Sequence, residues 1–233
     1  MKVVILQSNY IPWKGYFDLV HDADIFVFYD EVKYTKNDWR NRNRIYTKNG
    51  LQWLSIPIEK QAVKQKISEV GITDASWQMQ HYKAIELGYR KAKHYEQLQP
   101  VLDFFYKENQ WNKLSSFNQS AIQYISTFLG IKTRFIDSGE LNLEGNKLDR
   151  LINILKQLKA TEYISGPAAK VYLSGAEDLF SSNNIKLSYK NYANYPQYPQ
   201  FSNTFEDAVS IFDLIAHIDK KQIGNYIWKW RDQ

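Results

Sequence analysis

The chain has 233 residues, 44% of them hydrophobic, and a formal net charge of +5. This length and composition favour one domain with a hydrophobic core of its own. Cysteine is absent, which excludes disulfides, Cys-ligated zinc, iron–sulfur clusters and thiol nucleophiles.

The first predicted elements are a strand, a loop and a short helix. Residues 2–6 form an apolar run, residues 7–13 form a loop, and residues 14–22 form the helix. Ligands of open α/β sheets bind beside the carboxyl ends of the strands, so this loop is a candidate site. The helix N-terminus favours an anion. Gly15 either lets a ligand approach the backbone or permits tight helix–strand packing.

A second buried strand is predicted at residues 25–29, an uninterrupted apolar run. Asp30 follows this strand directly. A carboxylate at this position can act in catalysis, bind a ribose hydroxyl, or cap the backbone. Residues 39–58 are predicted to form a β-hairpin, because Lys48-Asn49-Gly50 is a turn signal. Residues 67–72 are another candidate strand.

Arginine recurs in the first half of this hairpin. If the segment is extended, Arg40, Arg42 and Arg44 share one face; if it is helical, Arg42 points away from the other two. In both cases at least two guanidinium groups converge, which suits a phosphate or carboxylate. Between Glu31 and Gly50 six cationic side chains face two acidic ones, a net charge of +4. This favours an anionic ligand, with a solvated basic loop as the alternative.

The middle of the chain is predicted to be helical and to form an insertion in the domain. The predicted helices are 77–92, 95–107 with an interruption at Pro100, and 115–129. His81 lies on the first of them. Its side chain is either a general base, since the ordinary histidine pKa is near neutrality, or a structural residue.

The last third returns to alternating strands and helices. Strands are predicted at 132–136, 162–164 and 185–189, helices at 146–158, 168–173 and 207–218, and a docked tail at 220–230. Ser165 and Gly166 follow a strand as the first loop does, so both are predicted to face the same crevice as binding residues. Tyr198 lies in a tyrosine-rich loop that forms either a contact surface or a lid packed on the core.

Many residues of the first third match a known family pattern. They are Gln7, Tyr10, Pro12-Trp13, Gly15-Tyr16-Phe17, Asp24, Phe26-Val27, Asp30, Val32, Tyr34, Lys36, Trp39, Asn41-Arg42-Asn43-Arg44-Ile45 and Trp53-Leu54. Weaker matches occur at His81, at 163–166 with 172–173, and at 198–200. The chain thus resembles the WbqC-like proteins, which are found with bacterial surface-polysaccharide (O-antigen) biosynthesis. Ser8 and Lys33 depart from the pattern, which usually has proline and glutamine there.

The resemblance implies a transferase that acts on a nucleotide-linked amino sugar, by acyl or aminoacyl (glycyl) transfer to the sugar amine. Asp30 or His81 would accept a proton from that amine. The predicted substrate-binding residues are Gln7, Tyr10, Trp13, Gly15, Tyr16, Tyr34, Lys36, Trp39, Asn41, Arg42, Asn43, Arg44, Ser165, Gly166 and Tyr198. No metal site is predicted, no cofactor is assigned, and no residue identifies the donor.

Two other functions remain open. One is nucleotidyl transfer in the same crevice, with Mg²⁺ and with Asp30 as a metal partner. The other is a nucleic-acid-binding or anion-binding module built on the arginine cluster. The expected partner is a nucleotide-linked sugar or another phosphorylated small molecule and not nucleic acid. The chain shows neither a signal-peptide apolar region nor an apolar run near 18 residues, so we expect a cytoplasmic protein without stable membrane insertion.

The fold prediction combines these elements. Alternating strands and helices with buried apolar strands favour a single Rossmann-like three-layer α/β domain over residues 1–233. We expect a mostly parallel sheet, joined by the β-hairpin at 39–58 and the helical insertion at 77–129.

Overall fold

A sheet of five strands forms the centre of the protein, whose computed structural model describes residues 1–202 and 204–232. The strands are β1 (Lys2–Leu6), β2 (Ile25–Phe28), β5 (Arg134–Asp137), β6 (Glu162–Ser165) and β7 (Lys186–Tyr189). Their order is β5-β2-β1-β6-β7, and every neighbouring pair is parallel. All five carboxyl ends therefore lie along one edge, and the predicted parallel α/β sheet is confirmed.

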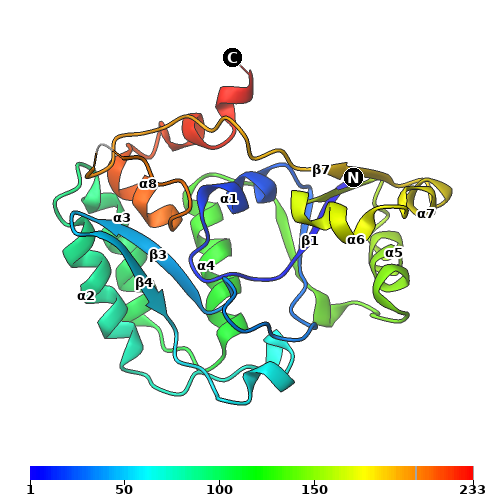
Figure 1. Ribbon diagram of the computed structural model, residues 1–233, viewed down its shortest axis with the longest axis horizontal. Coiled ribbons are helices and arrows are strands. Elements are labelled where there is room, and N and C mark those ends of the chain that lie inside the picture. Colours follow the sequence, from blue (N-terminus) through cyan, green and yellow to red (C-terminus); the bar gives the residue numbers. More distant parts are fainter. Residues whose placement is uncertain (203, 233) are drawn as a thin grey trace.

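Helices cover both faces of this sheet, as Figure 1 shows. One face packs against α1 (Lys14–His21), α4 (Leu114–Phe128) and α8 (Ile211–His217), with α2 (Trp77–Tyr89) and α3 (Tyr95–Asp103) behind them; the other packs against α5 (Lys147–Gln157), α6 (Lys170–Leu173) and α7 (Glu177–Ser182). Alternate strand residues explain the division, since Val4 enters the first core and Val3 and Ile5 enter the second. The three-layer prediction is confirmed.

The predicted hairpin is also present, as a separate antiparallel sheet. It consists of β3 (Arg42–Thr47) and β4 (Gly50–Ser55), with Arg44 opposite Trp53. Ile45 and Leu54 are buried in the core shared with α2 and α8, whereas Trp53 on the outer face is exposed. Figure 1 shows the hairpin in front of α2, away from the central sheet.

Three elements differ from the sequence-based expectation. The predicted strand at 67–72 is instead a 3-10 turn, Ile67–Glu69, because Ile67 and Val70 point inward three residues apart. Helix α3 continues through Pro100, whose ring is on the solvent side, and a π-helical turn (Phe104–Glu108) follows it. Helix α7 was not predicted.

The C-terminal tail docks on the domain as short 3-10 turns, Ile223–Tyr226 and Lys229–Asp232. Other 3-10 turns are Ala62–Lys64, Ser138–Glu140 and Pro167–Ala169. Within the described part of the chain, no helix combines the length and apolar character needed to cross a membrane.

Candidate functional site

The strand order places a topological switch point between β1 and β6. From β1 the chain continues through α1 on one face to β2, whereas β6 arrives on the other side of β1 after α5 on the opposite face. The loops that leave β1 and β6 therefore diverge at the carboxyl edge. This divergence creates the crevice in which ligands of open parallel sheets bind. Of the predicted binding residues, Gln7 directly follows β1 and Ser165 is the last residue of β6.

A pocket of about 270 Å³ lies at the carboxyl end of β1. Its walls combine two indole rings with amide side chains. The lining residues are Asn9, Pro12, Trp13, Trp39, Asn43 and Ala208. Aromatic rings with a few amides are typical walls for a sugar ring or a base. We call this the Trp13 pocket.

Arg40 is the arginine that reaches the loop after β1. Its guanidinium donates to Gln7 Oε1 at 3.1 Å and to the side-chain oxygen of Asn9, and it lies 3.5 Å from Asp38. Sequence alternation had grouped Arg40 with Arg42 and Arg44. The grouping fails because Arg40 precedes β3, in a turn where the two-residue period does not hold. Arg40 was therefore missed as a site residue.

The loop after β1 is held in a strained conformation. Ile11 has a φ of 35°, a region that β-branched residues rarely adopt. The buried Asn43 side chain fixes it by donating to the carbonyls of Tyr10 and Ile11 at 3.1 and 2.8 Å. Such strain persists only where surrounding bonds over-determine the backbone, and it clusters at ligand sites. Asn43 thus acts on the pocket through the loop as well as by lining it.

Asp30 lies behind this loop and is fully buried. Its carboxylate accepts hydrogen bonds from Ser8 N at 2.9 Å and from Gln119 Nε2 at 2.9 Å. The same Gln119 nitrogen donates to Asp137 at 2.8 Å, so one amide joins the ends of β2 and β5. Burial raises the pKa of Asp30 above its ordinary value. In this conformation the carboxylate secures the strand ends and does not face the pocket.

His81 and Tyr10 form a second buried group. Tyr10 Oη lies 2.6 Å from His81 Nδ1 and 2.7 Å from Tyr106 Oη. Burial lowers the pKa of His81 to about 4, although a hydrogen bond with the Ser55 backbone acts in the opposite direction. With neutral His81 as acceptor, Tyr10 donates to it and Tyr106 donates to Tyr10. Tyr10 is fully buried and cannot stack on a ligand unless the loop moves.

Gly15 has a packing role that the structure makes explicit. The indole of Trp13 folds back over the first turn of α1, and a Cβ at Gly15 would lie 2.3 Å from that ring. Of the two interpretations given above, close packing therefore accounts for this glycine in the described conformation. Tyr16 is buried beside it and donates through its hydroxyl to the carbonyl of Gln7 at 3.1 Å.

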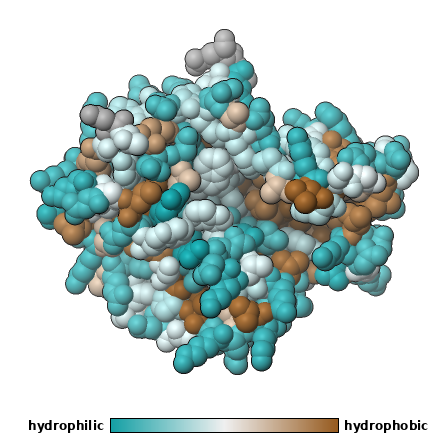
Figure 2. Space-filling model, in the orientation of Figure 1, coloured by the Kyte–Doolittle hydropathy of each residue, from teal (hydrophilic) through white to brown (hydrophobic). Residues whose placement is uncertain are grey.

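The other wall of the crevice comes from β6 and the short turn after it. Ser165 is buried and accepts a hydrogen bond from Tyr163 at 3.2 Å. Tyr172 on α6 is 64% exposed. Tyr192 connects the two walls, because its ring lies 5.2 Å from that of Trp13 and its hydroxyl lies next to Gly166. In Figure 2 the surface is hollowed between the regions of α1 and α6, with apolar residues on the α6 side.

A second and larger groove, of about 550 Å³, lies where the start of β3 meets the segment after β4. Its predicted site residues are Tyr34, Lys36, Asn41 and Arg42, and Lys60 is also part of its wall. Tyr34 donates to Asn41 Oδ1 at 2.8 Å. Arg44 instead donates to the carbonyl of Ala208, at the edge of the Trp13 pocket, at 2.9 Å. Arg42 thus lines the larger groove, whereas Arg44 lies at the edge of the Trp13 pocket.

Tyr198 is the residue of the tyrosine-rich loop that packs into the protein core. It is buried and donates to the carboxylate of Asp213 at 2.7 Å. The same loop surrounds Lys14, whose ammonium lies 5.0 Å from the Tyr195 ring centroid and 3.2 Å from Asp207. Burial lowers the pKa of Lys14. The loop is therefore tied to α1 and forms a wall beside the crevice.

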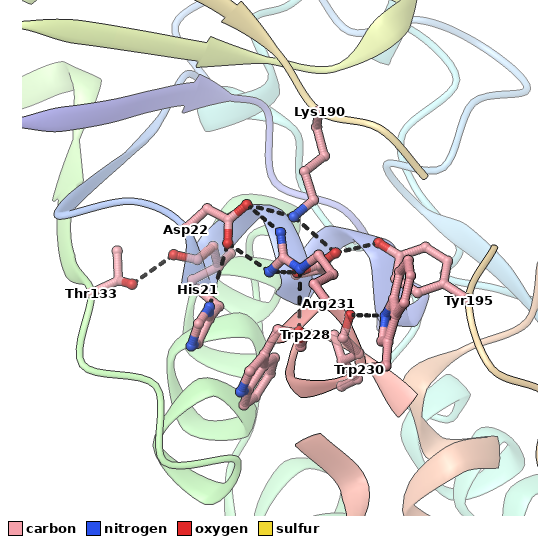
Figure 3. Close-up of polar contacts among 11 residues, drawn as sticks. His21, Asp22, Thr133, Lys190, Tyr195, Trp228, Trp230 and Arg231 are labelled. Carbon is pink, nitrogen blue, oxygen red and sulfur yellow. Dashed lines mark hydrogen bonds and ion pairs between the residues drawn. The ribbon is translucent and has the colours of Figure 1, made fainter. Parts of the chain in front are cut away.

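A network of ion pairs fixes the C-terminal tail to α1, as Figure 3 shows. Lys190 and Arg231 each contact both Asp18 and Asp22; the distances to Asp18 are 2.8 and 2.7 Å. Trp228 stacks on His21, with ring centroids 4.3 Å apart. None of these residues was predicted from the sequence as part of a site. The aspartates at positions 18 and 22 fit one helix face, but their partners are more than 160 residues away.

The same network bears on metal binding. Within residues 1–202 and 204–232, Asp18, His21 and Asp22 form the group of three potential metal-ligand side chains that lie close together. Lys190 and Arg231 already neutralise these carboxylates. The arrangement is therefore explained as an ion-pair cluster.

The family model of the WbqC-like protein family matches residues 7–224, so the chain belongs to this family. The chain is also 43% identical over 218 residues to "Uncharacterized protein Rv1507c" of Mycobacterium tuberculosis, covering 93% of this chain and 94% of that protein. The comparison with solved structures finds no match.

Proposed function

We propose that this protein binds a nucleotide-linked amino sugar at the carboxyl edge of its parallel sheet and transfers an acyl or aminoacyl group to the sugar amine, as a step in surface-polysaccharide biosynthesis. One observation carries the proposal. The loop after β1 brings Trp13, Arg40 and the Trp13 pocket together at the switch point of the sheet.

The size of the Trp13 pocket limits what it holds. Its volume of about 270 Å³ is near the lower end for small-molecule sites, which begin at about 300 Å³. One sugar ring fits this space better than a whole nucleotide sugar. We assign the ring to the walls of Trp13 and Trp39, and the remainder of the ligand to the crevice between β1 and β6.

Arg40 supplies the positive charge for this arrangement. Its side chain is 12% exposed, and its Nε atom has no hydrogen-bond partner within the described residues. The guanidinium lies 3.5 Å from Asp38 and also donates to Gln7 and Asn9, so an anionic ligand would bind it by replacing these weaker neutral contacts with charge-assisted hydrogen bonds. The diphosphate of a nucleotide sugar is such a ligand.

The chemistry requires an amine in its free-base form and a donor carbonyl. The amine nitrogen bonds to the carbonyl carbon, the bond to the donor's leaving group breaks, and the amine proton passes to that leaving group or to a base. Asp30 and His81 both lie behind the loop after β1. Either side chain would act as the base only after this loop moves.

Calorimetry with UDP-glucosamine at low salt tests the proposal. We expect binding that Trp13→Ala and Arg40→Ala each weaken, Arg40→Ala by roughly 1.5–3 kcal/mol, the range for hydrogen bonds to charged groups. The matched control is Arg134→Ala, an exposed arginine in β5. Undetectable binding would contradict the proposal, and pyrophosphate release from a nucleoside triphosphate would favour the nucleotidyl-transfer alternative.

A further inference from the structure

The outer face of the hairpin carries two tryptophans that the core does not use. Trp39 is 40% exposed and Trp53 is 48% exposed. Their ring centroids are 5.7 Å apart and their planes differ by 27°, so they form one stacked aromatic surface. We define the outer face as Trp39, Trp53, Arg42 and Arg44.

Both arginines of the outer face lack an acidic partner. In the described part of the chain, neither guanidinium lies within 4.0 Å of a carboxylate, and each donates to one backbone carbonyl, of Asn37 and of Ala208. The guanidinium carbons of Arg42 and Arg44 lie 4.7 and 5.5 Å from the Trp53 ring centroid. Four of the five guanidinium donors of Arg42 are thus left for water or a ligand.

The surrounding charge is mostly positive. Residues 31–66 contain nine cationic and three acidic side chains, a net charge of +6, which leaves −1 for the rest of the chain. Two of the acidic residues are already paired, Glu31 with Lys66 and Asp38 with Arg40. The groove of about 550 Å³ adds Lys36 and Lys60 to this surface, together with one carboxylate, Glu59, which accepts a hydrogen bond from Gln65.

We propose that the outer face and this groove bind single-stranded RNA. Exposed aromatic rings stack on bases of any sequence, and unpaired arginine and lysine side chains neutralise the phosphates. An isolated phosphate requires only the cations and leaves the two exposed indoles unexplained. A double helix fits less well, because its bases are already stacked on one another and offer no free ring face to the indoles.

One consequence rests on the proposed function. Trp39 belongs both to the outer face and to the Trp13 pocket, so an RNA strand on the face passes next to the acceptor amine. An RNA whose terminal ribose carries an aminoacyl ester would then be the donor. The amine nitrogen bonds to the ester carbonyl carbon, the bond from this carbon to the ribose oxygen breaks, and the amine proton ends on that oxygen.

The simplest structural alternative is that the arginines and tryptophans only stiffen the hairpin. Stacked cation–π pairs stabilise exposed strands by about as much as other cross-strand contacts. In that case replacement of Trp53 lowers the melting temperature and leaves no RNA affinity to lose. The experiment therefore measures both quantities.

Fluorescence anisotropy of a labelled 12-nucleotide oligo(A) RNA, titrated with the full chain at 50 mM salt, tests the inference. We expect binding whose affinity falls with salt, with a logarithmic slope of about −2 for three neutralised phosphates. Trp53→Ala should weaken binding about 5- to 150-fold, the fold-change that corresponds to loss of one stacked base. The variant Arg42→Ala/Arg44→Ala should reduce the slope, and Trp53→Phe should retain most of the affinity.

The control variant is Lys147→Ala/Lys156→Ala, which removes two exposed cations from α5 on the opposite face of the sheet. Absence of RNA binding by the wild type, or equal loss of affinity in the control variant, overturns the inference. Binding of polygalacturonate in place of RNA, with the same dependence on Arg42 and Trp53, assigns the face to anionic glycans and also overturns it. UDP-glucosamine binding is measured separately, so failure of this inference and failure of the proposed function give different results.

Discussion

Arg231 and Arg42 have guanidinium groups in opposite electrostatic settings. Arg231 donates to Asp18 and Asp22 at 2.7 and 2.8 Å and anchors the tail on α1. Arg42 contacts a backbone carbonyl and an indole ring, and no carboxylate of the described chain lies within 4.0 Å of it. Paired arginines that join distant segments serve the fold. Unpaired arginines beside a groove remain available for a ligand.

The largest expected effect comes from the ion-pair network that Asp18 forms with Lys190 and Arg231. Asp18→Ala should lower the free energy of unfolding by about 3–5 kcal/mol, because Lys190, Arg231 and Tyr195 all lose the acceptor that they share in this buried carboxylate. Urea denaturation at pH 7 measures the change. As a control, Asp178→Ala removes an exposed carboxylate and should cost less than about 1 kcal/mol. Equal effects of the two variants would show that the α1 network contributes little.

The second prediction concerns a buried polar group without an ionic partner. Burial lowers the pKa of His81 to about 4, below its value of about 6.5 in the unfolded chain. Between these values the unfolded state binds the extra proton, so stability is fully present above pH 6.5 and is lost as the pH falls towards 4. The loss between pH 7 and pH 4 should be about 3 kcal/mol.

Denaturation of wild type and His81→Gln at several pH values checks this. The variant should be less stable at pH 7 and should lose less stability than the wild type between pH 6.5 and 4. If both proteins respond to pH alike in that range, burial does not lower the pKa of His81 in the folded protein, and the prediction is wrong.

The third prediction concerns Arg42, the arginine of this comparison that has no carboxylate partner in the described chain. Arg42→Ala should weaken binding of the oligo(A) RNA by roughly 1.5–3 kcal/mol while leaving stability unchanged. Arg42→Lys should recover only part of the affinity, because the bidentate geometry is lost. Titration with RNA and thermal melting provide the two readouts, and the affinity for UDP-glucosamine should stay unchanged. A variant that melts earlier but binds as the wild type does would place Arg42 with the structural arginines.

The smallest expected effect belongs to Arg231. Its side chain is 33% exposed, so solvent screens its ion pairs. Arg231→Ala should therefore lower the free energy of unfolding by only about 1 kcal/mol, and the difference should shrink in 1 M salt. Chemical denaturation at low and high salt measures it. A loss as large as that of Asp18→Ala would mean that the tail shields the network from water.

Periodicity and turn chemistry predicted most of the architecture. The apolar runs at 2–6 and 25–29 gave buried strands, and Lys48-Asn49-Gly50 gave the hairpin turn. The segment 67–72 failed because a short apolar run also fits a 3-10 turn that buries every third residue. The helix interruption predicted at Pro100 is absent. Pro100 is exposed, so water can hydrogen-bond the carbonyl that the missing proline N–H leaves unpaired.

The sequence by itself determined the location of the charge and the chemistry of the first loop, since both depend on residues close together in the chain. It could not determine which side chains reach solvent. Burial of Tyr10 and His81 depends on Tyr106, and the free guanidinium of Arg42 depends on the absence of a carboxylate from any other segment of the described chain. The pairing of Asp18 with Lys190 and Arg231 likewise joins residues that only the folded sheet and its tail bring together.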